Sequence, residues 1–293
     1  MTQPTLEHTP ELMPSFDGTS IAARRMGAGG GTPLLVVNAV GATLAIWRRA
    51  LAASAGERPI LTWDHRGLHA SKSPESDRNT AGTHAEDAVA VLDRFDIEKV
   101  AIASWSNGTR IALEITSRYP ERVVSLVTVC GAYGYSLRRL VRHLHLPSVL
   151  PLAAGVGKHF ASYIEGPVRA LAARPELAGF IRQSGFVGPT ADTAALVDLL
   201  RDMAQCDPKR FLAAYEAVAG DSAPDLLREV DVPALVVAGD RDTFVPLPIS
   251  QKIARLIPSS RLEVYERATH FLPIEFPARL SDDLRAFWEE LGH

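Results

Sequence analysis

The sequence feature that most restricts the fold is one stretch, residues 99–115. It begins as an apolar run rich in β-branched residues, which predicts a buried strand, and continues with apolar residues at helical spacing. Between these two parts the chain reads Ser104-Trp105-Ser106-Asn107-Gly108. A strand that turns directly into a helix strains the backbone of its corner residue and presents that side chain clear of both elements. The stretch therefore predicts a nucleophilic serine at a strand-to-helix corner.

Ser106 is the better of the two serines for this corner. Strand and helix approach closely only where the residues two before and two after the corner are small, and around Ser106 these are Ser104 and Gly108. With Ser104 at the corner, the bulky Ile102 would take the first of these positions. Glycine is usual where Ser104 stands, and serine is nearly as small. A tight turn without chemistry stays open on this pattern alone.

Composition restricts the class of protein. A chain of 293 residues with 46% hydrophobic residues is long enough for one large domain or for a core with an inserted subdomain. A formal net charge of −3 gives no reason to expect nucleic acid or an anionic membrane as a partner. Cys130 and Cys206 lie far apart and lack the neighbours of a metal site, so we expect neither a disulfide framework nor a bound metal.

The composition of the N-terminal residues and of the longest apolar runs bears on the expected location of the protein. Residues 1–14 are polar and lack the basic start and apolar run of a secretory signal. No stretch approaches the roughly 18 apolar residues that a membrane-spanning helix needs. We therefore expect a soluble, cytoplasmic protein. We expect a small molecule as its partner, and the sequence does not decide whether the protein forms a homodimer.

The order of apolar runs predicts the fold. Asp17-Gly18 suits a hairpin turn between two short strands. Buried-strand patterns then alternate with helical patterns, which argues for a doubly wound, mostly parallel α/β sheet whose site lies at the carboxyl ends of its strands. The predicted strands cover residues 33–38, 59–63, 99–105, 125–130, 233–238 and 261–265, and predicted helices include 43–53, 82–95, 249–256 and 277–291.

Residues 135–219 interrupt this alternation. They contain no convincing strand, and their helical patterns are broken by several prolines. We predict that this segment is an inserted helical cap, or lid, and that residues 1–134 and 220–293 together form the α/β core.

A serine at such a corner needs a base within hydrogen-bond reach, and the base needs a group that fixes its tautomer. His270 follows a predicted strand beyond the insertion, and Asp242 follows the preceding strand. One helix and one strand separate them, which returns the chain to the same edge of the sheet. Asp240 is the alternative acid, although it could instead bond the local backbone. We predict a Ser106–His270–Asp242 catalytic triad.

With these residues the chain resembles the α/β-hydrolase superfamily, in its cap-bearing group of esterases, lactonases and carbon–carbon bond hydrolases. The resemblance covers nearly the whole chain and is architectural only in the cap and the N-terminal residues. One of the motifs that carry the resemblance is residues 64–71, which match the family's Asp-x-Arg-Gly-x-Gly-x-Ser loop with His69 in place of the second glycine. The other motifs are residues 104–108, 239–242 and 269–271.

The resemblance implies an oxyanion hole formed by the backbone N–H groups of Val40 and Asn107. Donors of this kind each contribute roughly 10²- to 10³-fold in rate. The chain departs from the family here, because Asn38-Ala39 stands where His-Gly is usual. Alanine can supply the backbone, and Gly41 can restore the freedom that the missing glycine gave.

Other polar or aromatic residues near the predicted site are weaker candidates. Asn38, Trp105 and His69 are candidate pocket residues, but for each we favour another role. We expect Asn38 to bond a neighbouring loop, Trp105 to pack under the cap, and His69 to be structural or solvated. Asp64 and Arg66 are expected to pair or to bond loop backbone rather than to touch substrate.

These predictions give a serine hydrolase that needs no cofactor and cleaves a carboxylic ester of a small to medium apolar substrate through an acyl-serine intermediate. A lactonase or a carbon–carbon bond hydrolase would use the same triad, so the residues do not separate these activities. An alternative of another class is a ligand-binding sensor, that is, a pseudo-hydrolase without turnover. The reason to consider it is that Asn38-Ala39 replaces the family's His-Gly.

Overall fold

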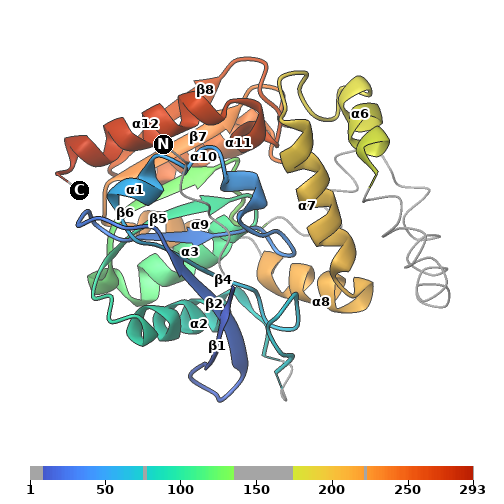
Figure 1. Cartoon of the computed structure of the whole chain (residues 1–293). Helices are drawn as coiled ribbons and strands as arrows, with labels where there is room; N and C mark the ends of the chain where they lie inside the picture. The colour runs from blue at the N-terminus through green and yellow to red at the C-terminus, as the bar shows by residue number, and fades with distance from the viewer. Residues whose placement is uncertain (1–8, 75–77, 135–173, 221–222, 293) are drawn as a thin grey trace.

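The computed structural model describes residues 9–74, 78–134, 174–220 and 223–292, and its centre is an eight-stranded sheet (Figure 1). The strand order is β1-β2-β4-β3-β5-β6-β7-β8. β1–β2 and β2–β4 are antiparallel pairs and the other neighbours are parallel, which confirms the predicted, mostly parallel sheet. The strands are β1 (Glu11–Pro14), β2 (Ser20–Met26), β3 (Leu34–Val37), β4 (Ile60–Trp63), β5 (Val100–Trp105), β6 (Val123–Val129), β7 (Ala234–Gly239) and β8 (Ser260–Tyr265).

The helices follow the predicted pattern except after β3. The predicted helix over residues 43–53 is wrong: a short 3₁₀ helix, η1 (Leu44–Trp47), and turns lead to α1 (Ser54–Glu57). All four residues of η1 are buried, so this segment has no polar face of the kind a surface helix needs. The other helices are α2 (Ala81–Arg94), α3 (Gly108–Arg118), η2 (Pro120–Arg122), α6 (Pro175–Gln183), α7 (Thr193–Gln205), α8 (Pro208–Ala219), α9 (Pro224–Arg228), α10 (Leu247–Leu256), α11 (Leu272–Glu275) and α12 (Pro277–Glu290).

The sheet is buried on both faces because successive strand residues point to opposite sides. In β3, Leu34 and Val36 belong to one apolar cluster, and Leu35 and Val37 belong to the other. The first cluster includes residues of η1, α1, α11 and α12, whereas the second includes residues of α2, α3 and α10. Helices therefore cover both faces, and Figure 1 shows α12 and the α2–α3 pair on opposite sides of the sheet.

Within the predicted cap, the described residues form α6, α7 and α8, which lie together beside the core in Figure 1. Residues 135–173 lie outside the described residues, and the division into core and cap stays a prediction. Polar contacts link the α7 segment to the core near η1: Arg48 with Asp198 at 2.9 Å, Arg49 with Asp192 at 2.7 Å, and Thr43 with Asp202 at 2.5 Å.

The loop after β4 fastens the N-terminal hairpin to α2, and its key residue is the fully buried Arg66. Its guanidinium donates to Asp87 at 2.6 and 2.7 Å and to Asp17 at 2.6 and 3.1 Å. Its hydrogen bonds hold the pKa of Asp17 below the usual range. Asp64 pairs with Arg24 at 2.6 Å, so both loop residues have the structural role that we expected.

A pH-dependent stability follows from His65, whose buried ring lies between Trp63 and His84, with centroids 5.8 and 4.8 Å away. Burial, with His84 and His69 nearby, keeps the pKa of His65 well below its usual value. Below about pH 6.5 the unfolded chain therefore binds a proton at this ring that the folded chain does not. We expect the free energy of unfolding to fall by up to about 1.4 kcal/mol per pH unit below that point.

Urea unfolding at about pH 7.5 and about pH 5.5 measures this pH dependence. His65→Phe keeps a buried aromatic ring and removes the titrating group, so it should lose this part of the pH dependence. If parent and variant lose equal stability between the two pH values, His65 does not carry the effect.

Candidate active site

The turn from β5 into α3 has the geometry that the sequence predicts. Ser106 has a φ of +56°, in the left-handed region that non-glycine residues rarely adopt. A Cβ at Gly108 would lie 2.5 Å from both the Val37 and the Asn38 carbonyl oxygens. Only glycine therefore allows α3 to start this close to the end of β3, and this close approach places Ser106 at the carboxyl edge of the sheet.

The second serine of the motif is structural. Ser104 is fully buried, and its hydroxyl donates to the Val127 carbonyl at 3.0 Å and lies 3.0 Å from the Thr109 hydroxyl. Because Ser106 is partly exposed and Ser104 is not, the structure leaves Ser106 as the serine of this motif that a ligand can reach.

Ser106, His270 and Asp242 form one hydrogen-bonded series. The Ser106 Oγ lies 2.8 Å from His270 Nε2, and His270 Nδ1 lies 2.8 Å from Asp242 Oδ2. A carboxylate only accepts, so His270 carries its proton on Nδ1 and presents Nε2 as an acceptor to the serine hydroxyl. In this arrangement the imidazole can take the serine proton.

Asp242 is held independently of the histidine. Its Oδ1 accepts from the backbone N–H groups of Phe244 and Val245, both at 2.8 Å. The alternative acid, Asp240, is exposed and accepts from the Arg267 backbone N–H at 2.6 Å. The structure therefore brings Asp242 to His270 and directs Asp240 to a neighbouring turn.

Two residues that the sequence reasoning did not select lie close to the triad or hold a residue next to it. The thiol of Cys130, directly after β6, donates to the Thr269 carbonyl at 3.7 Å, and burial together with the nearby Asp242 charge raises the pKa of this thiol well above its usual value. Among the described residues, Cys130, Asp242 and His270 are the one set of side chains grouped closely enough to hold a metal ion. Within this set, His270 Nδ1 and Asp242 Oδ2 lie 2.8 Å apart and are hydrogen-bonded to each other, which is the contact that a catalytic triad requires.

Glu275 is the second such residue. Its buried carboxylate accepts from the Gly188 N–H at 2.7 Å, from the Thr269 N–H at 2.8 Å and from the Thr269 hydroxyl. It thereby ties the residue before His270 to the chain between α6 and α7. Nothing local in the sequence marks a glutamate in α11 for this role, because one of its partners, Gly188, lies 87 residues away in the chain.

Aromatic rings surround the histidine. Phe244 and Trp105 have centroids 4.9 and 5.3 Å from the His270 ring, and the Trp105 indole N–H donates to the His270 carbonyl at 3.0 Å. Phe186, which precedes α7 in the predicted cap, contacts Phe244 at 5.0 Å and Phe271 at 5.9 Å and is 42% exposed. The reachable side of the triad therefore has an apolar, aromatic boundary.

The loop after β3 lies beside this site, with its predicted residues bonded within the protein. Asn38 Nδ2 donates to the Thr62 hydroxyl at 3.1 Å, the bonding of a neighbouring segment that we favoured. His69 Nε2 lies 3.1 Å from the Gly41 carbonyl and 3.7 Å from Cys206 Sγ, so it contacts the loop and the predicted cap. The N–H of Val40, a predicted oxyanion donor, donates to Asn107 Oδ1 at 2.9 Å.

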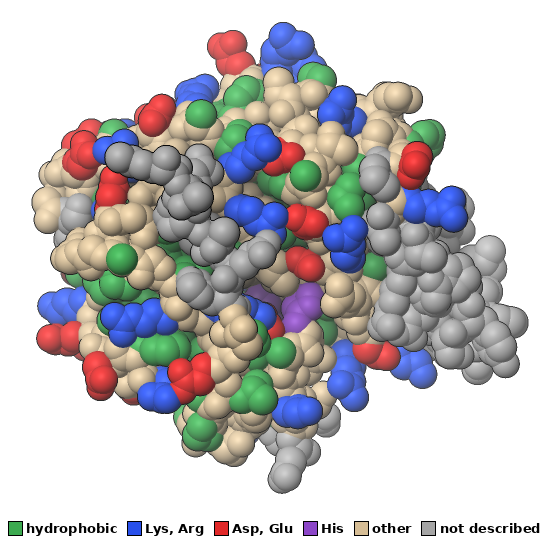
Figure 2. All heavy atoms as spheres, in the orientation of Figure 1, with side chains coloured by type: hydrophobic (Ala, Val, Ile, Leu, Met, Phe, Trp, Pro, Cys, Tyr) green, Lys and Arg blue, Asp and Glu red, His purple; other side chains and the backbone are tan. Residues whose placement is uncertain are grey.

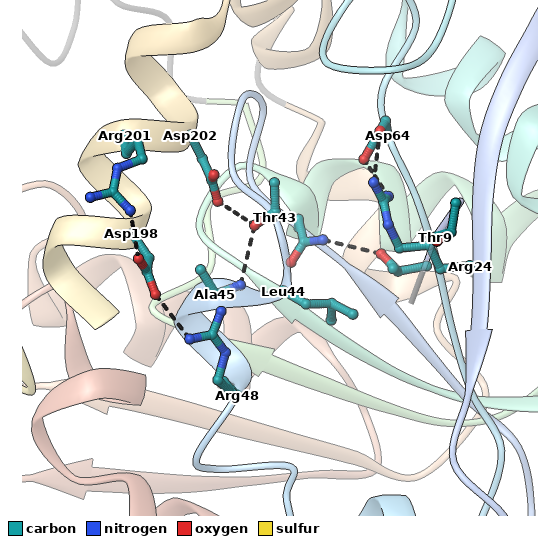
Figure 3. A pocket seen from close by; sticks show the side chains of 12 residues that line it. Thr9, Arg24, Thr43, Leu44, Ala45, Arg48, Asp64, Asp198, Arg201 and Asp202 are labelled. Atoms are coloured by element: carbon teal, nitrogen blue, oxygen red, sulfur yellow. Dashed lines mark hydrogen bonds and ion pairs between the residues drawn. The ribbon is translucent and has the colours of Figure 1, made fainter. Parts of the chain in front are cut away.

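A cavity of about 530 Å³ lies on another side of this loop, between η1, the ends of β2 and β4, and α7 (Figure 3). None of the three triad residues lines it. Its charged walls are largely paired with one another, as the dashed lines in Figure 3 show for Arg24 with Asp64 and Arg48 with Asp198. The cavity is thus part of the polar contact between α7 and the core and lies apart from the triad.

Comparison with known families decides the classification. Residues 32–277 match the family model described as the alpha/beta hydrolase fold. The chain belongs to the α/β hydrolase fold family. The resemblance seen in the motifs is confirmed, and the matched residues include strands β3 to β8 and the three triad residues.

Known members of the α/β hydrolase fold family that resemble the chain differ in activity. It is 27% identical over 276 residues to the dihydrolipoyllysine-residue acetyltransferase component of an acetoin cleaving system from Pseudomonas putida, covering 89% of this chain and 65% of that protein. It is 31% identical to a pimeloyl-[acyl-carrier protein] methyl ester esterase of Neisseria meningitidis serogroup B, covering 58% and 61%. The chain thus spans less than two thirds of these two relatives.

A third relative matches end to end. The 2-hydroxymuconate semialdehyde hydrolase of Pseudomonas sp. strain CF600 is 27% identical, with 97% of this chain and 96% of that protein covered. Among solved structures, an esterase from Thermogutta terrifontis has a TM-score of 0.70 at 20% identity, covering 97% and 99% of the two chains. The enol-lactonase from Burkholderia xenovorans LB400 also has a TM-score of 0.70, at 19% identity, covering 95% and 100%. These two structures support the fold.

The surface adds two observations. No helix among the described residues is long and apolar enough to span a membrane. On the face seen in Figure 2, basic and acidic side chains are interspersed, without the single-sign field that steers a polyanion.

Proposed function

We propose that this α/β-hydrolase-fold protein is a serine hydrolase that cleaves carboxylic esters through an acyl-serine intermediate. The observation that carries the proposal is the series Ser106 Oγ–His270 Nε2 and His270 Nδ1–Asp242 Oδ2, with 2.8 Å at each step. The positive φ of Ser106 supports it, since strained backbone conformations of non-glycine residues cluster at active sites.

In the proposed reaction, His270 takes the Ser106 proton as Oγ attacks the ester carbonyl carbon. Asp242 stabilises the imidazolium that forms, and the backbone N–H groups of Val40 and Asn107 stabilise the oxyanion. The imidazolium then gives its proton to the departing alkoxide, which leaves as the alcohol, and an acyl-Ser106 ester remains. Water, deprotonated by His270, attacks this ester and releases the acid.

The surroundings of the triad support an apolar substrate of small to medium size. The rings of Phe244 and Phe271 pack against His270, and Phe186 packs against both of them. Burial of apolar substrate surface against these rings would contribute about 25 cal/mol per Å². The exposed Phe186 comes from the predicted cap, so we assign the described part of that segment, residues 174–219, the role of bounding the substrate pocket.

The same residues could serve two other hydrolytic reactions. Carbon–carbon bond cleavage and lactone opening are alternatives, because the similar proteins include a 2-hydroxymuconate semialdehyde hydrolase and an enol-lactonase. A binding role without turnover is the alternative of another class, and the bonded Val40 N–H is the observation that favours it.

Pre-steady-state kinetics with p-nitrophenyl acetate, butyrate and octanoate tests the proposal. We expect a burst of p-nitrophenol equal to the concentration of folded enzyme, followed by slower turnover, and stoichiometric labelling of Ser106 by a fluorophosphonate. Labelling without ester turnover would favour lactones or carbon–carbon bonds as substrates. A folded protein that neither labels nor turns over would support the binding role.

A further inference from the structure

The Val40 backbone amide lies in a tight turn whose own hydrogen bond does not involve the Val40 N–H. The Ala42 N–H donates to the Ala39 carbonyl at 2.9 Å, and Gly41 has a φ of +79°, as the third position of a type II turn requires. Val40 is the second residue of this turn, so its N–H takes no part in the turn's own hydrogen bond. That N–H instead donates to the side-chain oxygen of Asn107, in a contact where both residues are at most 4% exposed.

Asn107 therefore contacts the predicted oxyanion hole in two ways. Its backbone N–H is one of the two predicted donors, and its side-chain oxygen is bound to the other, the N–H of Val40. An amide has one hydrogen, so a substrate oxygen can take the full strength of the Val40 donor only after the Asn107 oxygen withdraws. The carboxamide oxygen thus holds the place of the oxygen that the reaction would put there.

The exchange requires little movement of the loop. Asn38 Nδ2 anchors its start at Thr62, and His69 Nε2 lies within hydrogen-bond distance of the Gly41 carbonyl. A Cβ on Gly41 would lie 2.7 Å from the Phe211 ring of α8, so the loop is also closely packed on its outer side. With the backbone held in this way, rotation of the Asn107 side chain is the simplest way to free the Val40 N–H.

We propose, on the basis of the proposed function, that the Asn107 side chain gates the oxyanion hole by competing with the substrate oxygen for the Val40 N–H. A neutral ester carbonyl is an acceptor no better than a carboxamide and gains little from the exchange. A developing oxyanion is charged, and charged acceptors form hydrogen bonds roughly twice as strong. The gate therefore reserves this donor for the transition state, which is the form of binding that raises kcat.

Two substitutions separate this gate from a structural clamp. Asn107→Ala removes the competing oxygen, so kcat/KM should rise about 2- to 10-fold, the value of one neutral hydrogen bond. Asn107→Asp keeps the size and places a charged acceptor on the donor, so kcat/KM should fall at least about 10-fold. A clamp predicts the reverse order, because aspartate would still hold Val40 in place and alanine would not.

Thr62→Val is the control, because it removes the buried hydrogen bond from Asn38 in the same loop, together with one to the Val36 carbonyl, and leaves the Val40–Asn107 bond in place. All rates are normalised to the serine that a fluorophosphonate labels, and inhibition by butylboronic acid, whose Ser106 adduct mimics the oxyanion, gives a second readout. Tighter inhibition in Asn107→Ala and weaker inhibition in Asn107→Asp are expected.

The gate is wrong if Asn107→Ala loses activity while Asn107→Asp keeps it, or if Thr62→Val raises kcat/KM as much as Asn107→Ala does. A parent protein that is neither labelled nor active would instead refute the proposed function, so the two failures are distinguishable.

Discussion

Ser106→Ala is expected to lower kcat for ester hydrolysis by about 10⁶-fold, as loss of a triad nucleophile does in serine proteases. The reason is the geometry of the turn: Ser106 Oγ is the hydroxyl that lies 2.8 Å from His270 Nε2, and alanine leaves the imidazole with nothing to activate but water. Steady-state and burst kinetics with p-nitrophenyl butyrate measure the loss. Because the triad acts as a unit, adding His270→Ala to Ser106→Ala should cost little more.

Ser104→Ala is the control for the loss of a hydroxyl in the same motif. Ser104 bonds only the protein around it, so its removal should lower the free energy of unfolding by about 1–3 kcal/mol and leave the burst intact. A variant pair in which Ser104→Ala abolishes the burst and Ser106→Ala keeps it would overturn the assignment of the nucleophile.

The features that the sequence predicts well are those that depend on local pattern. Residues 99–115 predict a buried strand, a corner and a helix in one continuous stretch, and the structure has β5, Ser106 and α3 at these places. The parallel sheet is predictable for a similar reason, since its strands are nearly continuous apolar runs. Asp242 and His270 could be selected because strand ends of a parallel sheet meet at one edge.

The features that the sequence does not predict depend on contacts between distant segments. The helix expected over residues 43–53 gives way to η1 because all four residues of that element are buried, and tertiary burial overrides helix propensity. Glu275 joins Thr269 to Gly188, and no spacing rule connects these residues. The Asn107 side chain accepts from the Val40 N–H, 67 residues away in the chain, so this bond forms only once the turn from β5 into α3 and the loop after β3 are folded.

Asp242→Asn is expected to lower kcat by about 10⁴-fold, because the protein fixes which end of the new amide faces His270. Oδ1 of Asp242 accepts from two backbone N–H groups, those of Phe244 and Val245, at 2.8 Å each. An asparagine must place its carbonyl oxygen against these donors, which turns its NH₂ group toward His270 Nδ1. Nδ1 must then accept, so the ring proton moves to Nε2, and Nε2 can no longer accept the proton of Ser106.

The matched control is Asp240→Asn, two residues earlier in the same loop. Asp240 is exposed and accepts from the Arg267 N–H, a role that an amide oxygen fills as well, so kcat should stay within a few-fold of the parent. The kcat of both variants with p-nitrophenyl butyrate gives the comparison, and thermal unfolding checks that Asp242→Asn is folded. Equal losses of kcat in the two variants, or a kcat of Asp242→Asn within about tenfold of the parent, would mean that the Asp242 carboxylate does not set the tautomer of His270. The catalytic role proposed for Asp242 would then be wrong, while Ser106 could still be the nucleophile.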